Sequence, residues 1–128
     1  MKLKAFELLD IYESLSKISE QELDLETSYA IAKYLKEILV AKELIDGKRN
    51  KIIFKHAEKQ EDGNLKQTDN GGIEIHKEEI EKFNSEMDGL LNSEISIPKI
   101  SIKKSSLSSI TIPPKYLIPL IGVMLEDE

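Results

Sequence analysis

A stripe of apolar residues in the middle of this 128-residue chain constrains its fold more than any other feature. Along residues 26–58 the apolar positions repeat at spacings close to three and four, the period of one helix face; they are Ile31, Tyr34, Leu35, Ile38, Ala41, Ile45 and Ile52. A break at Asp46-Gly47 is the alternative, because Gly in a helix interior costs about 1 kcal/mol relative to Ala. Since Ile52 and Ile53 resume the pattern without a turn-length gap, the spacing favours one continuous helix.

Shorter helices are predicted on either side of this long one. Apolar residues recur every three positions from Leu3 to Ile18, which predicts a first helix over residues 3–18. With the long helix it makes a helical hairpin over residues 1–58. A third helix is predicted over residues 77–92, where glutamates in the first turns suit the helix dipole.

Two turn sequences lie between the long helix and the third helix. They are Glu61-Asp62-Gly63-Asn64 and Asp69-Asn70-Gly71-Gly72, and both are rich in residues that tolerate positive φ. Short apolar stretches follow each turn. Residues 59–76 are therefore predicted to form a turn-rich β-hairpin.

The C-terminal segment, residues 94–128, is predicted to hold a strand and a short helix. Apolar residues alternate along residues 94–103, and Pro98 in that run indicates an edge strand or a bulge. Pro113-Pro114 then suits the start of a short helix. Together the patterns predict one α+β domain over residues 1–128. It is mainly helical, with a long helix packed with two shorter helices, a small β-hairpin, and a C-terminal strand plus short helix.

The composition narrows the classes of function. The chain has no Cys, which excludes disulfides, Cys-based zinc sites and a thiol nucleophile. The net charge is −6, which disfavours generic binding to duplex DNA, because neutralising phosphates requires an excess of Lys and Arg. No signal peptide and no bilayer-spanning run of apolar residues are recognised. We expect a cytoplasmic protein that does not bind membranes.

A cluster of basic residues near the end of the long helix is the first candidate binding site. In a helix, its lysines fall on one stripe, and an Arg and a His seven positions apart lie on a neighbouring stripe; the cluster comprises Lys48, Arg49, Lys51, Lys55, His56 and Lys59. A phosphate-bearing ligand would be held by such a strip. The alternative is a solvated helix face, where cations near the C-terminal end also suit the helix dipole.

The apolar stripe of the long helix has two interpretations. It packs inside the chain as core, or it forms an interface between copies of a slender protein, and both can hold at once. The candidate interface residues are Ile38, Ile45, Ile52, Ile53 and Phe54. We expect a homo-oligomer.

No catalytic or metal site is recognised in the sequence. His76 lies among Glu74, Glu78 and Glu79, but two histidines and no Cys supply few metal ligands. Phosphate-binding loops, calcium loops and nucleophile elbows are not found. We therefore expect no cofactor and no enzymatic activity. A hydrolase or nuclease using His76 and Glu78 is the enzymatic alternative.

Four segments resemble a family of small uncharacterised proteins from phages and prophages of Gram-positive bacteria. They run from Lys4 to Leu15, from Tyr29 to Lys33 with Arg49 to Ile53, from Glu61-Asp62-Gly63-Asn64 into residues 80–91, and from Ile112 to Leu117. The chain departs from the family where His56-Ala57 stands in place of an expected Tyr-Gly pair. The resemblance implies a phage origin and an α+β fold with a helical hairpin, and it implies no activity.

These observations favour a non-enzymatic phage accessory protein that acts by binding in the host cytoplasm. Its partner would be a host protein, such as a defence factor, or a small anionic ligand such as a nucleotide signal. A structural or morphogenesis protein of the phage particle is the alternative.

Overall fold

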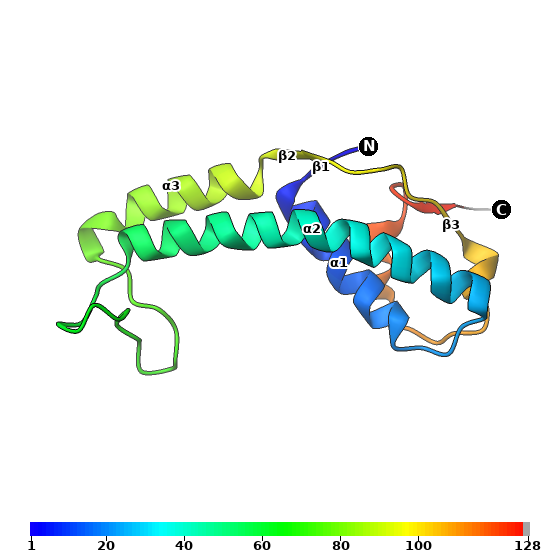
Figure 1. Cartoon of the computed structure of the whole chain (residues 1–128), viewed down its shortest axis with the longest axis horizontal. Helices are drawn as coiled ribbons and strands as arrows, with labels where there is room; N and C mark the ends of the chain where they lie inside the picture. The colour runs from blue at the N-terminus through cyan, green and yellow to red at the C-terminus, as the bar shows by residue number, and fades with distance from the viewer. Residues whose placement is uncertain (127–128) are drawn as a thin grey trace. The chain divides into compact units, whose positions relative to one another are not determined.

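A computed structural model describes residues 1–126 of the chain (Figure 1). Three α-helices and four short strands follow one another with four 3₁₀ turns among them. In chain order the elements are β1 (Lys2–Lys4), α1 (Ala5–Ser19), α2 (Leu25–His56), η1 (Lys77–Glu79), α3 (Ile80–Leu91), β2 (Glu94–Ser96), β3 (Ile102–Lys103), η2 (Lys104–Leu107), η3 (Pro114–Tyr116), η4 (Ile118–Leu120) and β4 (Leu125–Glu126).

The predicted fold class is confirmed. The long helix α2 runs unbroken through Gly47, so the expected continuity holds. It packs with the shorter helices, and a small antiparallel hairpin, C-terminal strands and short 3₁₀ turns complete an α+β fold. Among residues 1–126, no helix combines the length and apolar character needed to cross a bilayer.

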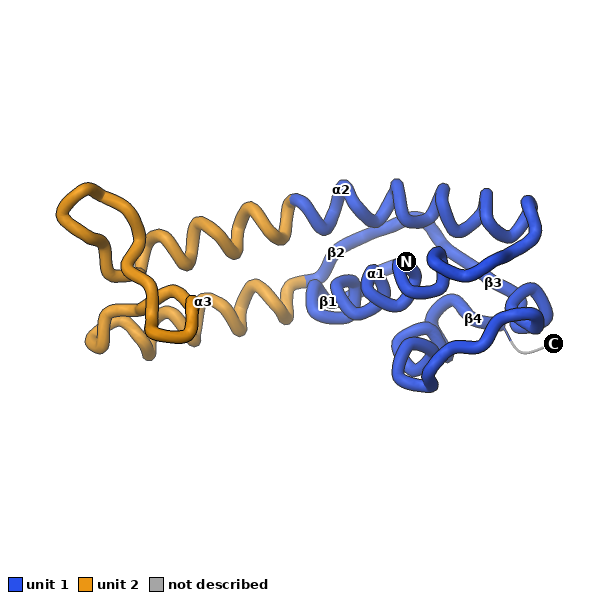
Figure 2. Tube along the Cα trace, turned by 90° about the horizontal axis from the view of Figure 1, so that it is seen from below, with its two compact units in different colours: residues 1–43, 94–128 blue, residues 44–93 orange. Residues whose placement is uncertain are grey.

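The chain groups into two compact units (Figure 2). Unit 1 comprises Met1–Glu43 and Glu94–Glu128, and unit 2 comprises Leu44–Ser93. Helix α2 contributes its first part to unit 1 and its last part to unit 2. The expectation of one domain over residues 1–128 stays a prediction.

Unit 1 is built around α1, whose inward face is fully apolar apart from Ser14. Lys42 of α2 places its ammonium 5.2 Å from the ring centroid of Tyr12 on α1, and the Tyr34 hydroxyl donates to the Ser101 carbonyl. The core also takes side chains from the C-terminal segment; its most buried large members include Leu8, Ile11, Leu15, Ile18, Ile31, Ile38, Ile100 and Leu120. Unit 1 therefore holds an ordinary hydrophobic core.

Unit 1 contains two small two-stranded sheets, one of β1 with β2 and one of β3 with β4. Strand β1 pairs antiparallel with β2, with Leu3 opposite Ile95, so Leu3 and Lys4 are strand where the sequence predicted the start of a helix. This pairing is long-range, and the helical spacing of Leu3 with Phe6 conceals it. The strand predicted over residues 94–103 divides at Pro98, which has no N–H to donate. Its second half, β3, pairs parallel with β4.

Unit 2 contains the end of α2, the segment 57–76, and α3. The views agree that α3 lies beside the last part of α2 (Figures 1 and 2). The third helix begins with the 3₁₀ turn η1 and continues as α3, within the predicted range of residues 77–92. This unit buries few apolar side chains, and polar contacts hold it together.

Candidate functional site

A buried histidine joins the two helices of unit 2. The ring nitrogen Nδ1 of His56 lies 2.9 Å from Oε2 of Glu79, and Nε2 lies 3.0 Å from Oε2 of Glu86. The His56 side chain is only 2% exposed, and the Phe83 ring meets it edge-on at 6.2 Å between centroids. His56 is the last residue of α2, Glu79 is the last residue of η1, and Glu86 lies within α3. The contact therefore links the end of α2 to α3. We call these three residues the His56 clamp.

The geometry of the His56 clamp, with a carboxylate at each ring nitrogen, favours a protonated imidazole. A neutral ring carries one N–H and can donate to only one carboxylate, whereas both nitrogens here face carboxylate oxygens. The hydrogen bond to Glu86 raises the pKa of His56, burial opposes this, and the bond to Glu79 adds to the rise. The imidazolium is thus the form that satisfies both bonds.

The carboxylates of the His56 clamp are held ionised. The hydrogen bond from Lys55 lowers the pKa of Glu86, and His56 lowers it further. Lys55 Nζ lies 2.7 Å from Glu86 Oε1, and this bond raises the pKa of Lys55 in return. Hydrogen bonding to His56 likewise lowers the pKa of Glu79. The cluster is therefore a set of paired charges in which each member stabilises the ionised form of another.

Residues 57–76, the predicted hairpin of unit 2, form a compact structure that we call the cap. Three antiparallel bridges build it: Ala57 with Ile75, Lys59 with Leu65, and Gln67 with Ile73. The Glu58 amide donates to the Glu74 carbonyl, the Glu74 amide to Lys66, and the Lys66 amide back to Glu58. These bonds close a ring at the centre of the cap. The Lys66 ammonium also faces the carboxylates of Glu58 and Glu74, at 3.4 and 3.8 Å.

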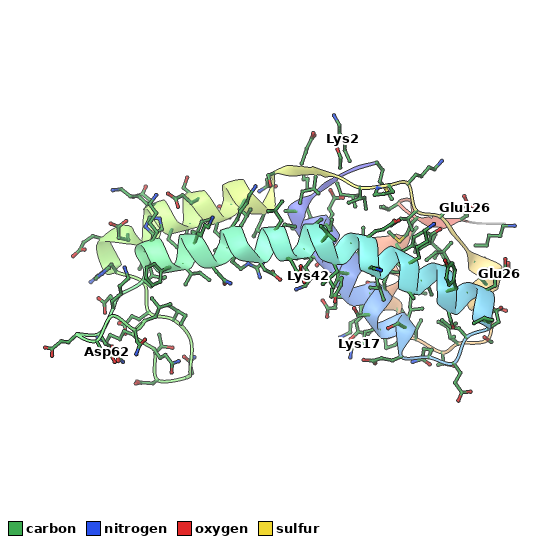
Figure 3. All side chains as sticks on the ribbon, viewed as in Figure 1. Lys2, Lys17, Glu26, Lys42, Asp62 and Glu126 are labelled. Carbon is green, nitrogen blue, oxygen red and sulfur yellow. The ribbon has the colours of Figure 1, made fainter. Side chains whose placement is uncertain are left out.

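Two tight turns form part of this cap. Gly63 and Gly71 both have φ of +86°, a left-handed conformation in which a side chain is strained. The Asp62 carboxylate accepts from the Asn64 amide and closes the first turn, and Asp62 is labelled at the cap in Figure 3. The turns recur with a spacing of eight residues, which also relates Glu58, Lys66 and Glu74. Both turns lie where the sequence predicted them, and the expected small antiparallel hairpin is confirmed.

Some residues of the predicted basic strip contact other side chains of the chain, and others are exposed or half-buried on α2. Lys55 and His56 bond to the α3 carboxylates, and the Lys59 ammonium lies 4.3 Å from the ring centroid of Phe54. The remaining three, Lys48, Arg49 and Lys51, lie earlier on α2 with exposed or half-buried side chains. His56 is buried and therefore does not face a ligand from solvent. An anionic ligand on this strip stays a prediction that rests on those three residues.

The predicted interface residues also divide. Ile38 and Ile45 are buried within the chain, and Ile52 and Ile53 are half-buried. Only Phe54 is largely exposed, at 53%. A homo-oligomer stays a prediction, and any interface using this set would depend on Phe54.

The residues weighed for an enzymatic site do not come together as one. His76 faces Glu58, with Nδ1 3.4 Å from Oε1, and not its sequence neighbour Glu78. Among residues 1–126, no group of His, Asp and Glu has an arrangement that would hold a metal ion.

A groove in the C-terminal segment of unit 1 is the feature that the sequence reasoning missed. Its volume is about 600 Å³, and residues between Lys104 and Leu125 line it. The apolar lining comes from Leu107, Ile110, Ile112, Leu117, Ile121 and Leu125, and the polar lining from Lys104, Ser105, Ser108 and Thr111. We call it the C-terminal groove. In Figure 1 this segment runs from the gold η2 to the red β4.

The fold of the segment explains why the C-terminal groove stays open. Leu120 and Met124 point into the core of unit 1, at 0% and 2% exposed. Pro113, Pro114 and Pro119 break the chain into two 3₁₀ turns, so the neighbours of the buried residues turn outward. Ile121 is consequently 61% exposed at the groove.

The surroundings of the C-terminal groove are basic, although the whole chain is acidic. Residues 97–125 contain Lys99, Lys103, Lys104 and Lys115 and no Asp or Glu. Because the chain carries a net charge of −6, this segment differs in sign from the remainder. Glu126 follows it directly and lies opposite Lys103 in the pairing of β3 with β4, so the basic character at the groove comes from Lys104 and Lys115.

Comparison with protein-family models, curated proteins and solved structures found no match to this chain.

Proposed function

We propose that this chain is a non-enzymatic phage accessory protein that acts by binding a host protein through the C-terminal groove. The observation that carries the proposal is the groove itself, an apolar hollow of about 600 Å³ with Ile121 exposed beside it. Concave, mainly apolar surfaces with a few polar groups are the usual sites of ligand and partner binding. Covering such a surface contributes about 25 cal/mol per Å² of apolar area removed from water.

The chemistry of the lining supports binding over catalysis. Among the described residues that line the groove, the only ionisable side chain is Lys104, and neither an imidazole nor a carboxylate is present. General acid–base catalysis uses such groups within hydrogen-bond reach of the substrate. In the ionisable cluster of unit 2, in contrast, both ring nitrogens of His56 are already hydrogen-bonded to the carboxylates of the His56 clamp.

The phage context comes from the sequence. The segments Lys4 to Leu15 and Ile112 to Leu117, among others, resemble small phage and prophage proteins of Gram-positive bacteria. The second of these segments forms part of the groove lining through Ile112 and Leu117. A small phage protein that binds stoichiometrically to a host factor would need such a surface and no active site.

Binding of the dye anilinonaphthalene sulfonate, an apolar anion, tests the proposal. We expect its fluorescence to rise with the protein and to fall to near background with Ile121→Gln. The matched control is Ile118→Gln, because Ile118 is 68% exposed but does not line the groove. Circular dichroism would verify that both variants fold. Equal dye binding by both variants, or none by the native chain, would overturn the proposal.

A further inference from the structure

We infer that the occupant of the C-terminal groove is an extended, acidic segment of the partner protein, which adds as a strand beside residues 110–112. The inference rests on the proposed function and specifies the chemistry of the partner. Three properties of the groove lead to it: an open backbone edge, an apolar floor and a basic surrounding.

The backbone edge is formed by Thr111 and Ile112. Among residues 1–126, neither their N–H groups nor their C=O groups take part in a hydrogen bond. The bonds on either side are local, from the Ile110 amide to the Leu107 carbonyl and from the Tyr116 amide to the Pro113 carbonyl. Backbone groups are strong hydrogen-bonding groups that proteins almost always pair when they are covered. A partner strand beside this segment would therefore pair the backbone groups on the edge that it covers.

The backbone conformation near this edge suits a strand. Ile112 precedes Pro113, and a residue before proline is driven toward extended conformations. Pro113 itself is extended, with φ of −59° and ψ of 140°. An extended peptide laid alongside one edge would pair its own N–H and C=O groups with those of Thr111, because in an extended chain the groups of Ile112 point to the opposite edge. This is strand addition, in which the backbone gives affinity and alternate side chains give specificity.

The apolar floor fixes the side chains that face it. Alternate residues of a strand point to the same face, about 6.6 Å apart at roughly 3.3 Å per residue. Ile110 and Ile112 belong to the lining on the edge side, and Leu117 and Ile121 belong to the facing turns. An occupant with apolar residues at every second position would place them among these four.

The charge of the occupant follows from the lysines. Lys104 lines the groove, and Lys115 is exposed next to the lining in the chain, whereas Lys103 lies opposite Glu126 of β4. Because the chain is acidic overall, an acidic ligand is attracted where lysines outnumber carboxylates, as they do in this segment. Carboxylates at the remaining alternate positions of the peptide would meet these ammonium groups, which favours an acidic segment over a basic one.

Titration calorimetry with three synthetic peptides tests the inference on the full chain. The first is an acetylated seven-residue peptide in which glutamate and valine alternate. The second replaces each glutamate by lysine, and the third keeps the glutamates but carries N-methyl groups on alternate amides. We expect the first to bind and the second and third to bind at least about tenfold more weakly.

Variants of the chain locate the binding. Thr111→Pro removes one edge N–H at an exposed position and is expected to reduce affinity about tenfold. Lys104→Glu is expected to weaken the acidic peptide and to strengthen the lysine peptide. Lys33→Glu, an identical change of charge outside the groove lining, is the matched control and should leave both affinities nearly unchanged.

The outcomes separate this inference from the proposed function. Equal binding of all three peptides, lost with Ile121→Gln, would overturn strand addition and charge selection while the groove remained a binding surface. Absence of peptide binding together with absence of dye binding would overturn both. Binding of the N-methylated peptide as tightly as the first, with the lysine peptide excluded, would overturn the strand and keep the acidic partner.

Discussion

The two units of this chain are stabilised in different ways. Unit 1 buries a continuous set of apolar side chains, among them Leu8, Leu15 and Leu120, each fully covered. Within unit 2, only Ile45 and Ala57 of the described residues are buried and apolar, and the buried polar residue is His56. Hydrophobic burial changes little with pH, whereas a histidine between two carboxylates does. The units should therefore respond to different perturbations.

The two units also expose different kinds of surface. Unit 1 combines a well-filled core with an open apolar groove, so its rigid part can present the groove residues in fixed positions. Unit 2 exposes a polar cap whose backbone is closed on itself through Glu58, Lys66 and Glu74. A partner that buries apolar side chains is therefore expected at unit 1.

The largest expected effect comes from removing core volume in unit 1. Leu8→Ala should lower the free energy of unfolding by about 3 kcal/mol, through lost burial and the cavity left behind. Near-ultraviolet circular dichroism during urea unfolding reports on this unit, because Tyr12, Tyr29, Tyr34 and Tyr116 all lie in it. Ile80→Ala in unit 2, where Ile80 is 45% exposed, is the control and should change stability far less. Similar losses in both variants would remove the distinction between the units.

The next effect comes from the His56 clamp. His56→Gln cannot carry a positive charge, so Glu79 loses its ion pair with His56 and Glu86 keeps only the pair with Lys55. We expect hydrogen exchange of residues 80–91 to accelerate by about tenfold. Exchange in α1 should stay the same. His76→Gln is the matched control, because His76 is exposed and faces a single carboxylate. Unchanged exchange in α3 of His56→Gln would contradict the clamp.

Alkaline and acidic pH should each loosen unit 2. Since the pKa of His56 is raised above 6.5, its contribution is full below pH 6.5 and is lost as the pH rises through the folded pKa. The pKa values of Glu79 and Glu86 are lowered below 4.5, so their contribution is present above pH 4.5 and is lost on acidification through the folded values. Hydrogen exchange of α3, corrected for its intrinsic pH dependence, should be slowest between these limits. A flat profile would show that the clamp contributes nothing.

The smallest effect sharpens the comparison within unit 2. Gly71→Ala places a side chain at φ of +86° and should destabilise the cap by about 1 kcal/mol. Gly89→Ala is the matched change, because its new methyl group also meets open space but lies inside α3. There Ala should stabilise the helix by up to about 1 kcal/mol. Thermal unfolding of the two variants should therefore move in opposite directions, and shifts of the same sign would contradict the assigned backbone.

The parts of the fold predictable from the sequence were those with local signals. The spacing of Ile31, Ile38 and Ile45 identified a continuous helix, and its apolar face prevailed over the cost of Gly47. The turns at Gly63 and Gly71 were expected because glycine tolerates positive φ. The pairing of β1 with β2 was missed, because it joins residues ninety or more positions apart.

The candidate sites were harder to predict, because they depend on which side chains meet in space. His56 was grouped with the lysines of its own helix, whereas its partners Glu79 and Glu86 come from a later helix. The C-terminal groove depends on which of Leu120 and Ile121 turns inward. Three prolines around these residues interrupt the helix, so the sequence has no regular hydrophobic spacing that would show which one is buried.

The ionisation state of His56 tests the account of the two units most directly. Nitrogen-15 NMR of the histidine rings, with His76→Gln to assign the signals, shows which ring nitrogens carry protons. Because the pKa of His56 is raised above 6.5, we predict that at pH 6.5 most His56 rings carry protons on both nitrogens. A mostly neutral ring at pH 6.5, with one nitrogen bare, would contradict the claim that paired charges hold unit 2 together.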